Sequence, residues 1–430
     1  MKTYSVTICI SALMALLIGS CSDDKHSCSA DDNTTEVRHV PRRSAKRGVG
    51  YSFQLPQTDM LLLSGGISWF YNWGPSCSDD ITTEAKRYSI GFVPMAWNNH
   101  YDTVVIANSS AIFDGEYLLA FNEPNLTNEA NMTPAQAAAY WPALKSFAAT
   151  HNLKIVSPAL NYGTLPGYSD PTVWLDEFLS QDGVSADDIH AIALHCYMSS
   201  ASSLKSFIDK FRKYGKPVWL TEFCAWDESI TSAESQIAYM SEAVSYLEEN
   251  DLVERYAWFI PRHNGYPYMA LLEDERLTDA GHVYVGASSA DKGAFAFPSQ
   301  VWPASQYQAS NVSECMDADV EFKPAPRLRI AQDAKAVTDL EVTDFSTGKW
   351  LQYGVDATTE VSSLTLRLNT KVSSEVTISV DGSEAVNTQL STSGEWQEVS
   401  MPIDVPRGTH EVRISVVKGS LSLGWLRFGN

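Results

Sequence analysis

Two glutamates are the residues of this chain whose positions indicate chemistry. Glu123 stands in the sequence Phe-Asn-Glu-Pro-Asn, directly after the apolar run 117–120, and Glu222 follows the apolar run 217–220. Each run is predicted to be a buried β-strand, because it is short and apolar. Cleavage of a glycosidic bond needs two carboxyl groups, one to protonate the leaving oxygen and one to attack or stabilise the sugar carbon. The pair therefore indicates a glycoside-cleaving enzyme, whereas the alternative for each glutamate is a capping or ion-paired surface carboxylate.

The elements that must position these glutamates occupy the middle of the chain. Eight strand-like runs occur there, at 48–53, 67–71, 91–95, 117–122, 154–157, 189–196, 217–222 and 255–259. Helices are predicted between several of them, most clearly over 133–149, 203–214 and 232–249. This alternation over about 240 residues predicts a (β/α)8 TIM barrel of the α/β class, with Glu123 ending the fourth strand and Glu222 the seventh. Barrel enzymes carry their chemistry at these strand ends.

Alternation along the strands predicts which side chains enter the barrel. On the seventh strand, Glu222 shares a face with Val218 and Leu220, so all three are expected to point inward. On the sixth strand, the same reasoning places His195 and Tyr197 on the inward face, beside Glu222.

The fourth strand cannot follow simple alternation if both of its polar residues act in the site. Asn122 and Glu123 are consecutive, so they would point to opposite faces of a regular strand. Pro124 marks the end of that strand. We therefore expect a β-bulge, or the end of the strand, at this position.

Six motifs around these strands resemble a known enzyme family. They are Trp-Phe-Tyr-Asn-Trp-Gly at 69–74, Phe-Val-Pro-Met-Ala-Trp at 92–97, Phe-Asn-Glu-Pro at 121–124, His-Cys-Tyr at 195–197, Thr-Glu-Phe at 221–223 and Trp-Phe at 258–259. Together they resemble glycoside hydrolase family 128, a clan A family of endo-β-1,3-glucanases. The resemblance implies a retaining enzyme acting on laminarin- or curdlan-type β-1,3-glucan, with Glu123 as general acid/base and Glu222 as nucleophile.

The resemblance also implies roles for the residues around the two glutamates. Asn122 would hydrogen-bond the 2-hydroxyl of the sugar, a contact that strengthens in the transition state. Glu123 must begin protonated, so its site is expected to raise its pKa. Glu222 must begin ionised, with Tyr197 or His195 as hydrogen-bond donors.

Several aromatic residues are candidates for contact with sugar rings. Trp73, Trp97 and Trp226 follow strand ends, and each could form the floor of a sugar subsite or pack in the core. By the resemblance, Trp258 is the tryptophan that ends the eighth strand in this clan, usually followed by a non-proline cis peptide bond. His195 has its own alternative, a buried barrel histidine without a direct role.

Other chemistries find no support in the sequence. It contains neither His-Glu-x-x-His nor a Cys-x-x-Cys pair, so no catalytic metal is expected. The nucleophile motif Gly-x-Ser-x-Gly and a dinucleotide-binding glycine loop are also missing, and the reaction needs no cofactor. A formal net charge of −21 argues against nucleic acid as a partner.

The first residues predict export. Residues 1–20 have a lysine near the start and a short apolar core, which is typical of a signal peptide. Small residues before Cys21 resemble a lipobox, so Cys21 is expected to be lipidated and to anchor a surface-exposed protein in the outer membrane; an ordinary signal peptide is the alternative. Residues 21–45 are predicted to be a flexible tether.

The C-terminal region has a different character. After the predicted barrel (46–287) and a linker (288–300), residues 301–430 have short alternating strands and turns, which predict a β-sandwich. This part resembles carbohydrate-binding module family 6, a jelly roll, in which Trp396 would stack on a sugar. Two other expected binding positions hold Asp344 and Ser422, so a purely structural sandwich remains the alternative.

Three functions are compatible with these features. The leading prediction is a monomeric, surface-anchored retaining endo-β-1,3-glucanase with β-glucan as its partner. A hydrolase of another β-linked polysaccharide is the second, because clan A barrels host many substrates. A non-catalytic glycan-binding lipoprotein is the third, and the presence of both glutamates and Asn122 favours the enzyme over it.

Overall fold

The computed structural model describes most of the predicted barrel and sandwich. The described residues are 37–38, 44–287, 299–301, 306–308, 314–316, 328–333 and 340–430. The predicted signal peptide, Cys21 and most of the predicted tether and linker lie outside them. No helix within the described ranges has both the length and the apolar character that crossing a membrane requires.

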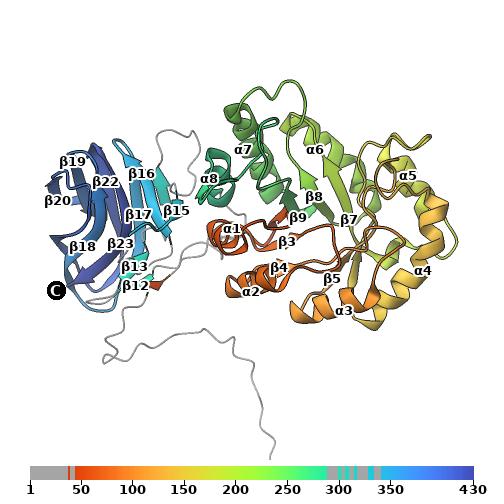
Figure 1. Cartoon of the computed structure of the whole chain (residues 1–430), viewed down its shortest axis with the longest axis horizontal. Helices are drawn as coiled ribbons and strands as arrows, with labels where there is room; N and C mark the ends of the chain where they lie inside the picture. Colours follow the sequence, from red (N-terminus) through yellow and green to blue (C-terminus); the bar gives the residue numbers. More distant parts are fainter. Residues whose placement is uncertain are drawn as a thin grey trace, which may run out of the picture. The chain divides into compact units, whose positions relative to one another are not determined.

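Eight parallel strands form the barrel (Figure 1). They are β2 (Arg47–Gly50), β3 (Trp69–Tyr71), β4 (Gly91–Phe92), β5 (Tyr117–Leu119), β6 (Lys154–Val156), β7 (Ile189–Cys196), β8 (Val218–Phe223) and β9 (Val253–Trp258). Their order is β4-β3-β2-β9-β8-β7-β6-β5, and a parallel bridge between Met95 and Leu119 joins the two ends. All eight predicted strands are present, so the predicted (β/α)8 barrel is confirmed.

Helices follow the strands and cover the outside of the sheet (Figure 1). They are α1 (Pro56–Leu63), α2 (Asp79–Arg87), α3 (Thr103–Ile112), α4 (Pro134–Thr150), α5 (Pro171–Leu179), α6 (Ala201–Asp209), α7 (Ala233–Glu249) and α8 (Asp279–Gly286). Helix α4 begins where the sequence indicates, because Thr133 and Gln136 form a capping box ahead of a first-turn proline. Such local signals explain why the helices could be predicted.

The residues of β8 that face the barrel interior differ from those predicted. The barrel interior is a separate apolar cluster drawn from β3 to β9 and the segments that follow them, and it contains Trp219, whereas Val218 and Leu220 pack in the other cluster, between the sheet and the helices. The register of β8 shifts next to Thr221, so that Glu222 lies opposite His195 of β7. The expectation that Val218 and Leu220 point inward is therefore wrong. A bulge adds one residue and reverses the alternation, which brings Trp219 and Glu222 to the same face.

The end of β5 departs from alternation as expected. Regular pairing stops at Leu119, and Ala120 and Phe121 both pack in the outer cluster. Asn122 then forms a parallel bridge with Ala159, and Glu123 adopts a left-handed backbone conformation with φ of 44°. This conformation is uncommon for a residue other than glycine. It lets both polar side chains be buried at the strand end.

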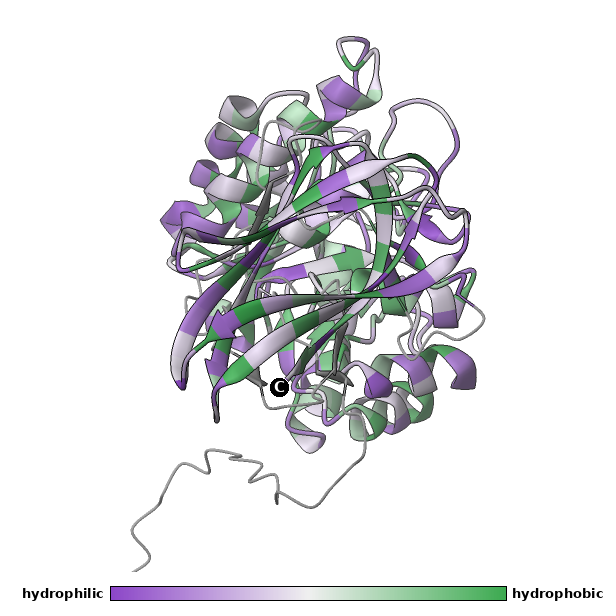
Figure 2. Cartoon of the chain, turned by 90° about the vertical axis from the view of Figure 1, so that its left-hand side faces the viewer, coloured by the Kyte–Doolittle hydropathy of each residue, from purple (hydrophilic) through white to green (hydrophobic). Residues whose placement is uncertain are grey.

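The C-terminal region is a β-sandwich, as predicted. One sheet contains β16 (Leu340–Ser346), β18 (Val361–Thr370), β21 (Trp396–Val405) and β23 (Ser420–Gly429), and the other contains β17 (Trp350–Ala357), β19 (Ser374–Val380), β20 (Ser383–Leu390) and β22 (Gly408–Lys418). These strands pair antiparallel within each sheet. Hydrophobic and hydrophilic residues alternate along them (Figure 2), which gives each sheet one face for the core.

Candidate active site

Glu222 lies at the end of β8 and is held by aromatic hydrogen-bond donors. The hydroxyl of Tyr71 donates to its Oε1 over 2.9 Å, and the indole N–H of Trp73 donates to the same oxygen over 2.7 Å. The hydroxyl of Tyr197 donates to Oε2. The side chain is buried, and hydrogen bonds to a charged acceptor are stronger than those between neutral groups. The carboxylate is therefore held firmly in one orientation.

Glu123 is buried as well, but its partners differ in kind. Its Oε1 lies 2.9 Å from Nδ1 of His195 and accepts a hydrogen bond of 3.2 Å from Nδ2 of Asn161. Asn161 follows β6 and its own Oδ1 accepts from the backbone N–H of Tyr162, which fixes the amide orientation.

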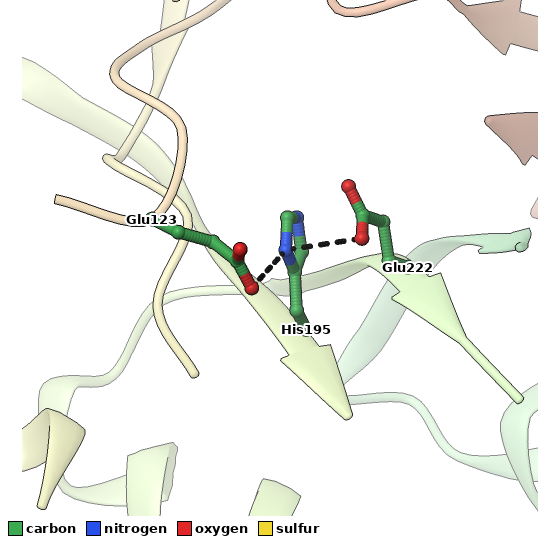
Figure 3. A group of neighbouring side chains, drawn as sticks. All are labelled: Glu123, His195 and Glu222. Carbon is green, nitrogen blue, oxygen red and sulfur yellow. Dashed lines mark hydrogen bonds and ion pairs between the residues drawn. The ribbon is translucent and has the colours of Figure 1, made fainter. Parts of the chain in front are cut away.

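His195 links the two glutamates (Figure 3). Its side chain is fully buried, and Nδ1 lies 2.9 Å from Oε1 of Glu123 and 3.4 Å from Oε2 of Glu222. One carboxylate oxygen of each glutamate and a ring nitrogen of His195 all lie within 4.8 Å of one another. Because an ionised carboxylate can only accept, Nδ1 carries a proton when both glutamates are ionised.

The charges in this trio shift the pKa values of Glu123 and His195 in opposite directions. Burial alone would raise the pKa of Glu123, but the charge of His195 and the hydrogen bonds from His195 and Asn161 outweigh it and lower that pKa. Burial opposes protonation of His195, yet the charges of Glu222 and Glu123 raise its pKa above the ordinary value. The expected rise in the pKa of Glu123 is therefore wrong. The reason is that the nearby charge of His195 and the hydrogen bonds from His195 and Asn161 favour the ionised form of Glu123 more than burial disfavours it.

The trio also offers three atoms that could bind a metal ion. However, the oxygens of Glu222 accept hydrogen bonds from Tyr71, Trp73 and Tyr197. These N–H and O–H groups point their positive ends at the carboxylate, where a cation would have to lie. The donor set thus suits a free carboxylate better than a metal ligand.

Asn122 lies beside this trio and is buried. Its Nδ2 donates to Oε2 of Glu129 over 3.3 Å, and its Oδ1 is buried without a hydrogen-bond partner among the described residues. Its backbone N–H donates to the carbonyl of Trp97 over 2.8 Å. Trp97 is half-buried against the apolar cluster inside the barrel.

An aromatic group adjoins Glu222. The ring of Phe259 lies 5.8 Å from Trp73, 5.5 Å from Tyr197 and 6.4 Å from Trp226. Trp226 keeps 41% of its surface exposed, so this aromatic group reaches the surface of the protein. Tyr197 and Trp73 thus have two roles, because each donates a hydrogen bond to Glu222 and each packs against Phe259.

Trp258 does not belong to the site. It is fully buried, its indole N–H donates to the carbonyl of Met269, and its ring packs against Phe223 and Tyr284 in the outer cluster. The expectation that Trp258 contacts substrate is therefore wrong, and the residue after it, Phe259, is the one that packs against the aromatic residues around Glu222. The non-proline cis peptide bond also lies one residue further along, between Phe259 and Ile260.

Sequence reasoning missed four residues of the site: Tyr71, Glu129, Asn161 and Phe259. Tyr71 ends β3 within the motif at 69–74, and Asn161 follows β6, so a search of all strand ends could have found both. Glu129 gave no comparable signal, because it lies in the segment after Glu123 and reaches Asn122 only through the fold. Trp396 belongs to the sandwich, where it is half-buried at the first position of β21.

A parallel barrel with two buried glutamates at its strand ends is the architecture of a clan of glycoside hydrolases, and comparison with known proteins agrees. Residues 48–284 match the family described as glycosyl hydrolase catalytic core, and residues 326–430 match carbohydrate binding module family 6. The chain therefore belongs to the glycosyl hydrolase catalytic core family and is a glycoside hydrolase with a family 6 module.

Solved structures narrow the family to glycoside hydrolase family 128. A subgroup II endo-β-1,3-glucanase from Pseudomonas viridiflava is 40% identical, covering 57% of this chain and 99% of that one, with a TM-score of 0.53. Another from Sorangium cellulosum is 30% identical, with coverage of 57% and 99% and a TM-score of 0.52.

A yeast protein is also similar. Alkali-sensitive linkage protein 1 of Schizosaccharomyces pombe (strain 972 / ATCC 24843) is 31% identical over 232 residues, which are 51% of this chain. The matched part is 39% of the yeast protein, so this chain spans well under half of the length of that relative.

Proposed function

We propose that this protein is a retaining endo-β-1,3-glucanase that cleaves laminarin- or curdlan-type glucan. The single observation that carries the mechanism is the closeness of the two glutamates, whose nearest oxygens lie within 4.8 Å. Retaining enzymes hold their carboxyl groups about 5–5.5 Å apart and inverting enzymes about 6.5–9.5 Å apart, because the latter must admit a water molecule. The glucanase activity of the relatives from Pseudomonas viridiflava and Sorangium cellulosum supports the substrate.

In the first step, Glu222 attacks the anomeric carbon of the bound sugar. The glycosidic C–O bond breaks, its electron pair passes to the leaving oxygen, and that oxygen takes a proton from Glu123. The products are a shortened glucan and a glycosyl ester on Glu222. Tyr71 and Trp73 keep the attacking carboxylate in one orientation, which reduces the entropy lost on reaching the transition state.

The proton for this step is held between Glu123 and His195. In the resting arrangement it lies on Nδ1 of His195, 2.9 Å from the oxygen of Glu123. As Glu222 bonds to the sugar, it loses the negative charge that stabilised the imidazolium. The proton can then pass to Glu123, which delivers it to the leaving oxygen.

In the second step, water cleaves the ester. Glu123, now ionised, removes a proton from the water molecule, whose oxygen attacks the anomeric carbon. The C–O bond to Glu222 breaks and the carboxylate is restored, again with its donors around it. Two inversions at one carbon release a product in the β-configuration.

The substrate can be tested by measuring release of reducing ends from laminarin, curdlan, lichenan, cellulose and xylan. We expect activity on laminarin and curdlan, little on lichenan, and none on cellulose or xylan. Activity confined to another glycan would support a different hydrolase. Binding of glucan without any release would support the non-catalytic glycan-binding protein.

The mechanism can be tested by proton NMR of the fresh hydrolysis product. We expect the β-anomer to accumulate first and to mutarotate later. Initial accumulation of the α-anomer would exclude Glu222 as a nucleophile and would require an inverting reaction.

We also propose that the sandwich binds glucan through Trp396. Attachment to an insoluble polymer raises the effective concentration of substrate near the barrel, whereas soluble oligosaccharides gain nothing from it. Trp396→Ala in the full chain should therefore reduce the rate on insoluble curdlan several-fold and leave the rate on laminarihexaose unchanged. Equal rates of variant and wild type on both substrates would assign the sandwich another ligand or a structural role.

A further inference from the structure

The main chain of Asn122 is held in place by hydrogen bonds to two other segments. On one side its backbone N–H donates to the carbonyl of Trp97 over 2.8 Å, and on the other its backbone carbonyl accepts from the N–H of Ala130 over 3.2 Å. The segment between Asn122 and Ala130 is folded back, with a further hydrogen bond of 2.8 Å from the N–H of Met132 to the carbonyl of Pro124. The main chain thus brings Glu129 next to the side chain of Asn122.

The two ends of this amide have different environments. Nδ2 donates to Oε2 of Glu129 over 3.3 Å, whereas Oδ1 is buried and has no hydrogen-bond partner in the part of the chain that the structure describes. An ionised carboxylate can only accept, so Glu129 pairs with the NH2 group and not with the carbonyl of the amide. It therefore decides which end of Asn122 is left for another molecule.

A buried carbonyl oxygen without a partner costs free energy that a donor can recover. A sugar hydroxyl is such a donor. The position also adjoins the catalytic pair, because Asn122 is buried and directly precedes Glu123 in the chain. The unpartnered oxygen of Asn122 is therefore a candidate acceptor for a hydroxyl of a sugar bound next to Glu123.

We propose that Glu129 is a positioning residue that orients the amide of Asn122, so that Oδ1 accepts a hydrogen bond from the 2-hydroxyl of the sugar being cleaved. This inference rests on the proposed function. As the sugar carbon gains positive charge, its 2-hydroxyl becomes a better donor, so a carbonyl acceptor gains strength in the transition state. An unrestrained amide could turn its NH2 group to the sugar and lose this gain.

The inference can be tested with two aryl β-laminaribiosides that differ only in the 2-hydroxyl of the reacting sugar. Glu129→Gln keeps the size of the side chain, but a glutamine can also donate and so no longer dictates the orientation of Asn122. We expect kcat/KM of Glu129→Gln to fall about tenfold on the hydroxyl substrate and less than twofold on the 2-deoxy substrate. The loss should lie in kcat rather than in KM, because the contact strengthens in the transition state.

Two further variants make the test specific. Glu116→Gln makes the same substitution on an exposed residue just before β5 and should change neither rate. In Asn122→Ala, addition of Glu129→Gln should cause no further loss on the hydroxyl substrate, since Glu129 would act only through Asn122.

Two outcomes would contradict the inference in different ways. Equal losses on both substrates, or an additive loss in the double variant, would overturn the role of Glu129 while leaving the glucanase intact. Failure of the wild-type enzyme to cleave either laminaribioside would overturn the proposed function and this inference with it.

Discussion

The two glutamates are the same residue type at equivalent strand ends, yet their environments differ. Glu222 accepts hydrogen bonds from two tyrosines and a tryptophan, whereas Glu123 is paired with His195 and Asn161. The difference shows how one fold can give two carboxyl groups separate roles.

The donors around the two glutamates also respond differently to pH. Burial, followed by the charge of Glu222, raises the pKa values of Tyr71 and Tyr197 well above their ordinary range, so both hydroxyls keep their protons. Against the effect of burial, the charges of Glu222 and Glu123 also raise the pKa of His195, but that pKa starts from a much lower ordinary value of 6.5. The pH dependence of the site should therefore come from the half that contains Glu123.

The largest effect is expected from Glu222→Ala. Without a nucleophile, kcat on laminarin should fall by about 10⁴-fold or more. Azide should restore part of the turnover by entering the space of the carboxylate, and should give an α-glycosyl azide. Glu116→Ala, an exposed residue before β5, serves as the control and should retain full activity. A β-glycosyl azide, or near-normal glucanase activity, would contradict the assigned role.

Glu123→Ala should have the next largest effect, and its size should depend on the leaving group. On laminarin we expect a loss of about 10²–10⁴-fold, the usual contribution of a general acid. On an aryl laminaribioside with an acidic phenol, the first step needs no proton and should proceed at near the wild-type rate. A burst of phenol followed by slow turnover would show that only the second step is impaired. Equal losses on both substrates would mean that Glu123 is not the acid.

His195→Asn should shift the pH dependence of the enzyme. In the wild type, the shared proton is lost only as pH rises through the raised pKa of His195. In the variant, a carboxyl group alone must keep that proton, so the alkaline limb of kcat/KM should move to lower pH, with a loss of about 10²-fold at neutral pH. His190→Asn, on the same strand but paired with Glu254, should leave the profile unchanged. An unmoved alkaline limb in His195→Asn would mean that the proton does not reside on this pair.

Tyr71→Phe should have the smallest effect. It removes one of three donors to Glu222, and a hydrogen bond to a charged group is worth about 1.5–3 kcal/mol. Because two donors remain, we expect a loss at the lower end of this range, roughly tenfold in kcat. The alkaline limb of the pH profile should not move. Tyr239→Phe is a matched control, because no described residue forms a hydrogen bond with that buried hydroxyl. A shifted pH profile in Tyr71→Phe would contradict the proposal that the pH dependence comes from the surroundings of Glu123 and not from those of Glu222.

Local patterns in the sequence were sufficient for the elements and for part of the site. Short apolar runs separated by helical periodicity predicted all eight barrel strands, and the capping residue Thr133 located the start of α4. Simple alternation correctly placed His195 on the inward face of β7, because that strand keeps a regular pattern up to this residue.

Features that depend on contacts between distant segments could not be read from the sequence. A bulge on β8 reversed the faces of Val218 and Leu220, because its position is set by pairing with neighbouring strands. The reach of Glu129 to Asn122 arises from the fold of the segment between them. The sequence by itself determined the barrel and the two strand-end glutamates. The tertiary structure alone decided how the pKa values of Glu123 and His195 shift, since those shifts depend on burial and on how closely the imidazole approaches both carboxylates.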